Sequence, residues 1–144
     1  MREKIRIAAG QGFWGDMLDA PVRQVEGGSI DYLMLDYLAE VTMSILQKQK
    51  ERDPRMGYAR DFLGAMESVM PAVHRGVKVI ANAGGVNPIG CAEALRELAR
   101  TSETGAKLRI GVVTGDDLLP RLDELLDWAV TCPDLDAFRA RLSA

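Results

Sequence analysis

The stretch Val77-Lys-Val-Ile-Ala81, continued by Asn82-Ala-Gly-Gly-Val-Asn-Pro88, decides the fold predicted for this chain. A nearly continuous apolar run is typical of a strand that is covered on both faces of a parallel sheet. In the Gly-rich turn that follows, Asn87 can cap a helix whose first position is Pro88. The stretch therefore predicts a strand, a tight loop and a helix, the repeating elements of a βαβ unit.

Three other short apolar runs also precede a Gly- or Asp-containing turn and a helical pattern. They are Ile5 to Ala9, Tyr32 to Leu35 and Leu108 to Val113. Two helices, about residues 39–52 and 61–75, stand between the second and third of the four strands. The sequence thus predicts an α/β fold, an open, mostly parallel sheet of about four strands with helices on both faces.

The last part of the chain predicts two more helices. Leu118, Leu122 and Leu126 share one apolar stripe, in which Pro120 is tolerated only within the first turn. Asp134 can cap a short final helix. We expect a domain that ends in such apolar-faced helices to self-associate or to need a downstream segment or partner subunit that covers them.

Composition limits the class of protein. The 144 residues fit a single domain, 1–144, and 18 Lys plus Arg against 21 Asp plus Glu leave a net charge of -3. This balance excludes the basic field that nucleic-acid binding needs. No apolar run approaches the roughly 20 residues of a membrane span, and no signal-peptide pattern follows Met1, so we expect a cytoplasmic protein without a membrane partner. Cys91 and Cys132 are expected to be reduced thiols.

Three glycines follow the first strand in the pattern G-x-G-x-x-G. They are Gly10, Gly12 and Gly15, and Asp36 stands 21 residues after Gly15. This spacing matches a dinucleotide-binding fingerprint, although Asp16 would place a carboxylate beside the pyrophosphate. Alternatively, the glycines only permit positive φ and close packing of helix on strand. Under the first interpretation, these glycines are candidates for substrate or anion binding.

The loop after the third strand predicts an anion site, because the amides at a helix N-terminus can bind a phosphate or carboxylate. An ordinary strand-to-helix turn is the alternative, and capping explains Asn87 and Pro88 without a ligand. The candidate binding residues in this loop are Asn82, Gly84, Gly85 and Asn87.

Carboxylates gather in the loops that follow the strands. If they lie at one sheet edge, they would raise one another's pKa or bind a hard cation such as Mg²⁺ or Mn²⁺. The candidate ligands of such a cation are Asp116 and Asp117. Single carboxylates at helix starts also occur merely as caps. The candidate catalytic residues are Asp16, Asp36, Glu40, Asp116 and Asp117.

Two other reactive residue types have simpler explanations. His74, the only histidine, stands at a predicted helix end before Gly76, where a cation suits the helix dipole. Cys91 falls in the first turn of a helix, and the sequence places no base beside it. We therefore interpret His74 as a helix-end residue and Cys91 as a small buried one.

Five motifs in order resemble the acyclic terpene utilisation family of AtuA-like proteins. They are Gly12-Phe-Trp-Gly-Asp16, Asp31-Tyr-Leu with Asp36-Tyr-Leu-Ala-Glu40, Asp53-Pro-Arg-Met-Gly-Tyr58, Asn82-Ala-Gly-Gly-Val-Asn-Pro88 and Thr114-Gly-Asp-Asp117. The resemblance covers residues 5–119. Members of the family are longer than this chain, so it resembles their N-terminal portion.

The resemblance implies a role in the breakdown of acyclic terpenes such as citronellol and geraniol, or of related branched acids, with CoA as part of the substrate. A site rich in carboxylates and poor in nucleophiles favours an enzyme with a hydratase, lyase or hydrolase step on an acyl-CoA or carboxylate. Two alternatives stay open: an NAD(P)-binding oxidoreductase domain, and a non-catalytic subunit of a larger assembly.

Overall fold

The computed structural model describes residues 4–101, 108–131 and 134–142. These residues divide into two compact units, Met1–Val113 and Thr114–Ala144. The single domain predicted for 1–144 stays a prediction.

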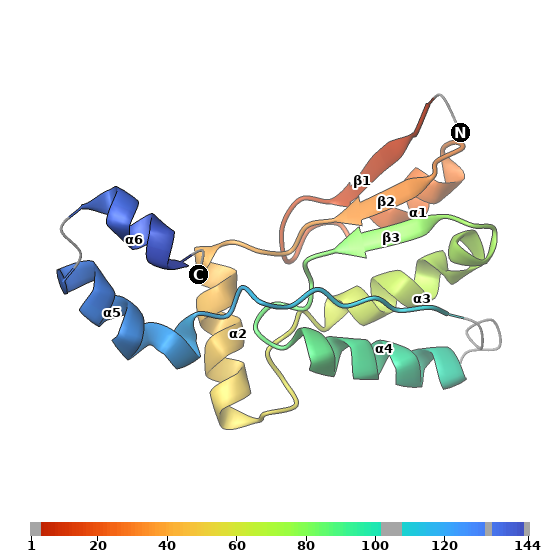
Figure 1. Cartoon of the computed structure of the whole chain (residues 1–144). Coiled ribbons are helices and arrows are strands. Elements are labelled where there is room, and N and C mark those ends of the chain that lie inside the picture. The colour runs from red at the N-terminus through yellow and green to blue at the C-terminus, as the bar shows by residue number, and fades with distance from the viewer. Residues whose placement is uncertain (1–3, 102–107, 132–133, 143–144) are drawn as a thin grey trace. The chain divides into compact units, whose positions relative to one another are not determined.

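The first unit alternates strands and helices (Figure 1). Its elements are β1 Ile7–Gln11, α1 Ala20–Glu26, β2 Tyr32–Leu35, α2 Glu40–Arg52, α3 Asp61–His74, β3 Lys78–Ala81 and α4 Pro88–Thr101. The strands form one parallel sheet in the order β1-β2-β3. The α/β fold, the open parallel sheet and the pair of helices between β2 and β3 are therefore confirmed.

One face of the sheet carries the core. Leu33 and Leu35 of β2 are buried there with Phe62 and Met66 of α3 and with Leu95 of α4. Helix α1 contacts β1, β2 and α3. Alternation along each strand brings every second side chain to this face, which holds the sheet on the three helices.

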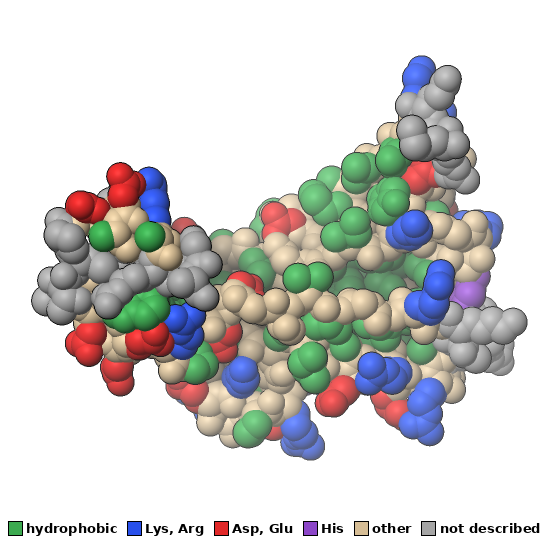
Figure 2. Space-filling view, in the orientation of Figure 1, with side chains coloured by type: hydrophobic (Ala, Val, Ile, Leu, Met, Phe, Trp, Pro, Cys, Tyr) green, Lys and Arg blue, Asp and Glu red, His purple; other side chains and the backbone are tan. Residues whose placement is uncertain are grey.

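The opposite face of the sheet is exposed. Ile7, Met34 and Ile80 come from the three strands at alternate positions and are 69%, 43% and 57% exposed. Figure 2 shows hydrophobic side chains gathered over this part of the molecule. Within the first unit, helices thus cover one face of the sheet, not both faces as the sequence predicts.

The predicted fourth strand, Leu108 to Val113, is a second correction. These residues are described, but they form no strand and pair with none. Ile110 packs against the core, whereas Val113 is 93% exposed. Gly111 lies in the middle of the run, and a glycine there weakens a strand because it offers no side chain for packing and loses more backbone entropy. Within the described residues, the sheet therefore has three strands instead of about four.

The second unit consists of short helices: the 3₁₀ helix η1 Leu119–Arg121, then α5 Leu122–Thr131 and α6 Leu135–Leu142. Pro120 lies in the first turn of η1, as predicted. The Asp134 carboxylate accepts a 2.8 Å hydrogen bond from the Ala137 amide, which confirms that it caps α6. No helix in the described part of the chain combines the length and apolarity that crossing a membrane demands.

Candidate functional site

The ends of β2 and β3 are joined by side-chain hydrogen bonds. Asn82 directly follows β3, and its Nδ2 donates to Asp36 Oδ1 at 2.7 Å. The Oδ1 atom of Asn82 accepts a 2.8 Å hydrogen bond from the Tyr37 amide. The Asp36 amide in turn donates to the carbonyl of Gln11 at the end of β1. Residues from all three strand ends therefore form one polar edge, the place where open parallel sheets bind ligands.

The network fixes the charge of Asp36. The pKa of this carboxyl lies below its ordinary value of 3.8, first because Asn82 donates to it and second because the Leu38 amide does. A carboxylate that stays ionised at neutral pH serves as a hydrogen-bond acceptor or base, not as an acid. Glu40, the other candidate on this side, begins α2 and is exposed.

The glycine loop after β1 is closed by Asp16. Its Oδ2 accepts the Gly12 amide at 3.0 Å and its Oδ1 accepts the Met17 amide at 2.7 Å. These two hydrogen bonds lower the pKa of Asp16. Gly15 has a φ of +92°, which requires glycine. Helix α1 begins only at Ala20, so the loop does not lead directly into a helix as a dinucleotide fingerprint does.

Asn87 acts as the predicted cap of α4, since its Oδ1 accepts the Gly90 amide at 3.1 Å. Its Nδ2 donates to the carbonyls of Pro54 and Met56, so its amide is occupied by structural contacts. A Cβ on Gly85 would lie 2.5 Å from Leu46 Cδ1 and one on Gly84 would lie 2.9 Å from Pro88. Close packing thus accounts for both of these glycines.

The amides of the loop after β3 are also largely occupied. Those of Gly85 and Asn87 donate within the loop, to Asn82 and Gly84, and that of Val86 donates to Gly57. An amide that already donates to a carbonyl is not available to an anion. Of the binding candidates in this loop, Asn82 is the exposed one that faces the polar edge through Asp36.

Two buried residues at this edge escaped the sequence analysis. Gln11 is 3% exposed and Tyr37 is fully buried, yet neither the Gln11 amide atoms nor the Tyr37 hydroxyl has a hydrogen-bond partner among the described residues. Gly10 is the sequence feature that could have indicated the burial of Gln11, because a glycine inside a strand often marks a bulge. A Cβ on Gly10 would lie 2.7 Å from Leu35, so the glycine is needed for packing.

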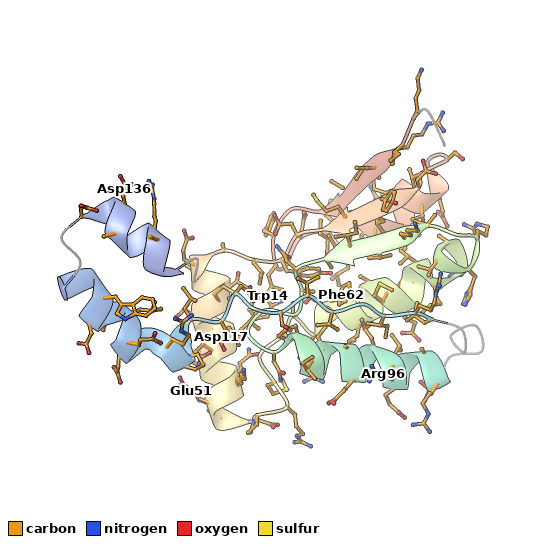
Figure 3. All side chains as sticks on the ribbon, viewed as in Figure 1. Trp14, Glu51, Phe62, Arg96, Asp117 and Asp136 are labelled. Atoms are coloured by element: carbon orange, nitrogen blue, oxygen red, sulfur yellow. The ribbon has the colours of Figure 1, made fainter. Side chains whose placement is uncertain are left out.

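Figure 3 labels Trp14 and Phe62, two aromatic residues of the first unit. Trp14 comes from the glycine loop and packs against the core cluster that contains Phe62 and Tyr37. The ring centroids of Tyr37 and Phe62 are 5.8 Å apart in an edge-on arrangement. Tyr37, which follows β2, is therefore packed among aromatic side chains of the core.

Two catalytic candidates remain, and neither belongs to the first unit. Asp116 and Asp117 belong to the second unit and are exposed, and Asp117 Oδ1 accepts the Leu119 amide at the start of η1. Their gathering with the other carboxylates stays a prediction. Within the residues that the structure describes, no group of three or more His, Cys, Asp or Glu side chains could hold a metal ion.

His74 and Cys91 have the positions expected for structural residues. His74 is the exposed last residue of α3. Cys91 is a free thiol that is 4% exposed, and burial raises its pKa to about 11. Cys132 lies outside the described residues.

Comparison with known proteins identifies one family. The family model described as acyclic terpene utilisation family protein AtuA matches residues 5–141. No curated protein and no solved structure matches the chain.

Proposed function

Since the chain belongs to the acyclic terpene utilisation family AtuA, we propose that it acts in the breakdown of branched acyclic terpenes or of related branched acids. We propose further that it binds an acyl-CoA or carboxylate substrate at the polar edge formed by Asp36, Asn82 and the end of β1. The step we favour is of hydratase, lyase or hydrolase type.

The observation that carries this proposal is the hydrogen bond between Asn82 and Asp36. It joins an ionised carboxylate and an amide at the C-terminal edge of the sheet, and Asn82 is exposed there. The Nδ2 group of Asn82 has a second hydrogen that can donate to a substrate oxygen. The Asp36 carboxylate can accept a proton or a hydrogen bond from water or from a substrate hydroxyl.

Isothermal calorimetry of the full chain tests the proposal. We expect geranyl-CoA to bind more tightly than CoA alone, and Asn82→Ala to weaken geranyl-CoA binding by about tenfold, the equivalent of about 1.4 kcal/mol. Glu97→Ala is the matched control, because it removes an exposed ion pair with Arg100 on α4. If geranyl-CoA binds no better than CoA, or binds equally to Asn82→Ala, the proposal is wrong.

A second candidate function, a subunit of a larger assembly, is favoured by the exposed apolar face of the sheet. Parallel sheets are ordinarily covered on both faces, and exposed apolar patches mark interaction sites. We propose a second copy of the chain as its cover. Sedimentation velocity of the chain and of Ile80→Asp tests this. A concentration-dependent dimer that the substitution abolishes supports it, and a monomer at all concentrations contradicts it.

A further inference from the structure

The bulge in β1 turns a polar side chain toward the core. Ala9 pairs with Met34, but Gln11 pairs with Leu35, so Gly10 is an extra residue in the strand. Without it, alternation from Ile7 and Ala9 would bring Gln11 to the exposed face. With it, Gln11 lies opposite buried Leu35 and is itself buried. Bulges that re-aim a side chain are common next to functional sites.

The reoriented side chain gains no protein partner there. Both Nε2 and Oε1 of Gln11 are buried without a hydrogen bond within the described structure. A buried amide in this state costs folding free energy, because it has lost its hydrogen bonds to water. The bulge that buries this amide therefore destabilises the fold locally. A role of the amide in binding a ligand would explain why the unpaired group is kept.

Tyr37 adds a second buried group on the same side of the sheet. It stands two residues after Leu35, the partner of Gln11, and its hydroxyl likewise has no hydrogen bond within the described structure. Burial, together with the nearby Asp61 carboxylate, raises the pKa of the Tyr37 phenol. Tyr37 therefore stays protonated and offers both a donor and an acceptor.

The chemistry of these groups selects the ligand. An amide that can donate and accept is matched by a group that does both, and a hydroxyl is such a group. A carboxylate or phosphate offers no donor, and the negative charge of Asp61, which already acts on the Tyr37 phenol, would oppose its binding. We propose that Gln11 and Tyr37 form a buried subsite that binds an uncharged hydroxyl group of the substrate, beneath the polar edge. The identity of the substrate rests on the proposed function, whereas the test of the subsite does not depend on it.

The test uses a small branched alcohol instead of a terpene compound. In ¹H-¹⁵N spectra of the full chain, we expect tert-butanol to shift the Gln11 side-chain amide signals saturably. Methyl tert-butyl ether lacks the hydroxyl donor and should bind to the wild-type chain about threefold to tenfold more weakly than tert-butanol does. Tert-butanol should bind to Tyr37→Phe more weakly than to the wild-type chain by a similar factor. Unmoved Gln11 signals, or equal responses to alcohol and ether, would overturn the inference.

A stability measurement separates a binding role from a structural one. If Gln11 is unpaired in the free protein, Gln11→Met keeps or raises the urea midpoint, because an apolar side chain of similar length removes the unpaired amide. A lower midpoint with unchanged slope would show that the amide stabilises the fold and would contradict the subsite. Both experiments are independent of geranyl-CoA, so their failure and the failure of the proposed function are distinguishable.

Discussion

Asn82 Nδ2 and Asp36 Oδ1 lie 2.7 Å apart, which ties the residue that follows β3 to the residue that follows β2. Because Asn82 also accepts the Tyr37 amide, one side chain both positions the backbone after β2 and holds the Asp36 carboxylate. The arrangement gives the sheet edge a fixed negative charge next to an amide donor. It also makes Asn82 the residue whose replacement is most informative.

Asn82→Ala should lower the free energy of unfolding by about 1–3 kcal/mol, because it removes one hydrogen bond to a carboxylate and leaves the Tyr37 amide without its acceptor. Urea denaturation measures the change. A loss below about 0.5 kcal/mol, the range of ordinary surface substitutions, would mean that these hydrogen bonds contribute little to stability.

The pH dependence of Asp36 follows from the same hydrogen bonds. Its pKa in the folded protein is lowered from 3.8, so its contribution to stability is present above pH 3.8 and is lost as the pH falls through the lower folded value. Carboxyl ¹³C shifts should show Asp36 titrating below 3.8 in the wild-type chain. In Asn82→Ala its pKa should move up toward 3.8, and an unchanged value would show that Asn82 is not the main cause.

Gly85→Ala should destabilise the fold by more than about 2 kcal/mol, because φ at Gly85 is +52° and the new Cβ would lie 2.5 Å from Leu46 Cδ1. Gly64→Ala is the matched control. A Cβ there meets nothing within 4 Å, and alanine in place of glycine inside α3 should stabilise by about 0.5–1 kcal/mol. Equal effects of the two substitutions in thermal unfolding would contradict this account of the loop.

Cys91 should react slowly with a disulfide reagent in the folded protein. Its pKa of about 11 leaves about one thiol in a thousand ionised at pH 8, and the side chain is buried. The rate is measured on a Cys132→Ser background and compared with the same chain in urea. A folded rate equal to the unfolded one would show that Cys91 is accessible and would reopen a reactive role for it.

Local patterns predicted the elements well. The run Tyr32 to Leu35 is β2 without change, and Asn87 and Pro88 begin α4 as their capping chemistry requires. Such features depend on residues close in sequence. The run Leu108 to Val113 has strand-like residues but forms no strand, because pairing also depends on what its neighbour offers and on Gly111.

The site was predictable only in part. The loops after β1, β2 and β3 were identified because the fold class places ligands there, and Asp36 and Asn82 do meet. Gln11 was missed because its burial depends on a one-residue shift in strand register, which a pattern of apolar residues does not encode. Asn87 is a predicted anion-binding residue, yet three backbone groups occupy its side chain. They are the carbonyls of Pro54 and Met56 and the amide of Gly90.

The central claim is that a branched acyl substrate binds at the polar edge through Asn82, and the side-chain amide signals of the chain test it most directly during titration with geranyl-CoA. Our account predicts that the Asn82 signals shift saturably. The Asn87 signals should move little, because its side-chain amide already donates to the carbonyls of Pro54 and Met56. The opposite result, with Asn82 unmoved while other signals respond, would place the substrate elsewhere and contradict the account.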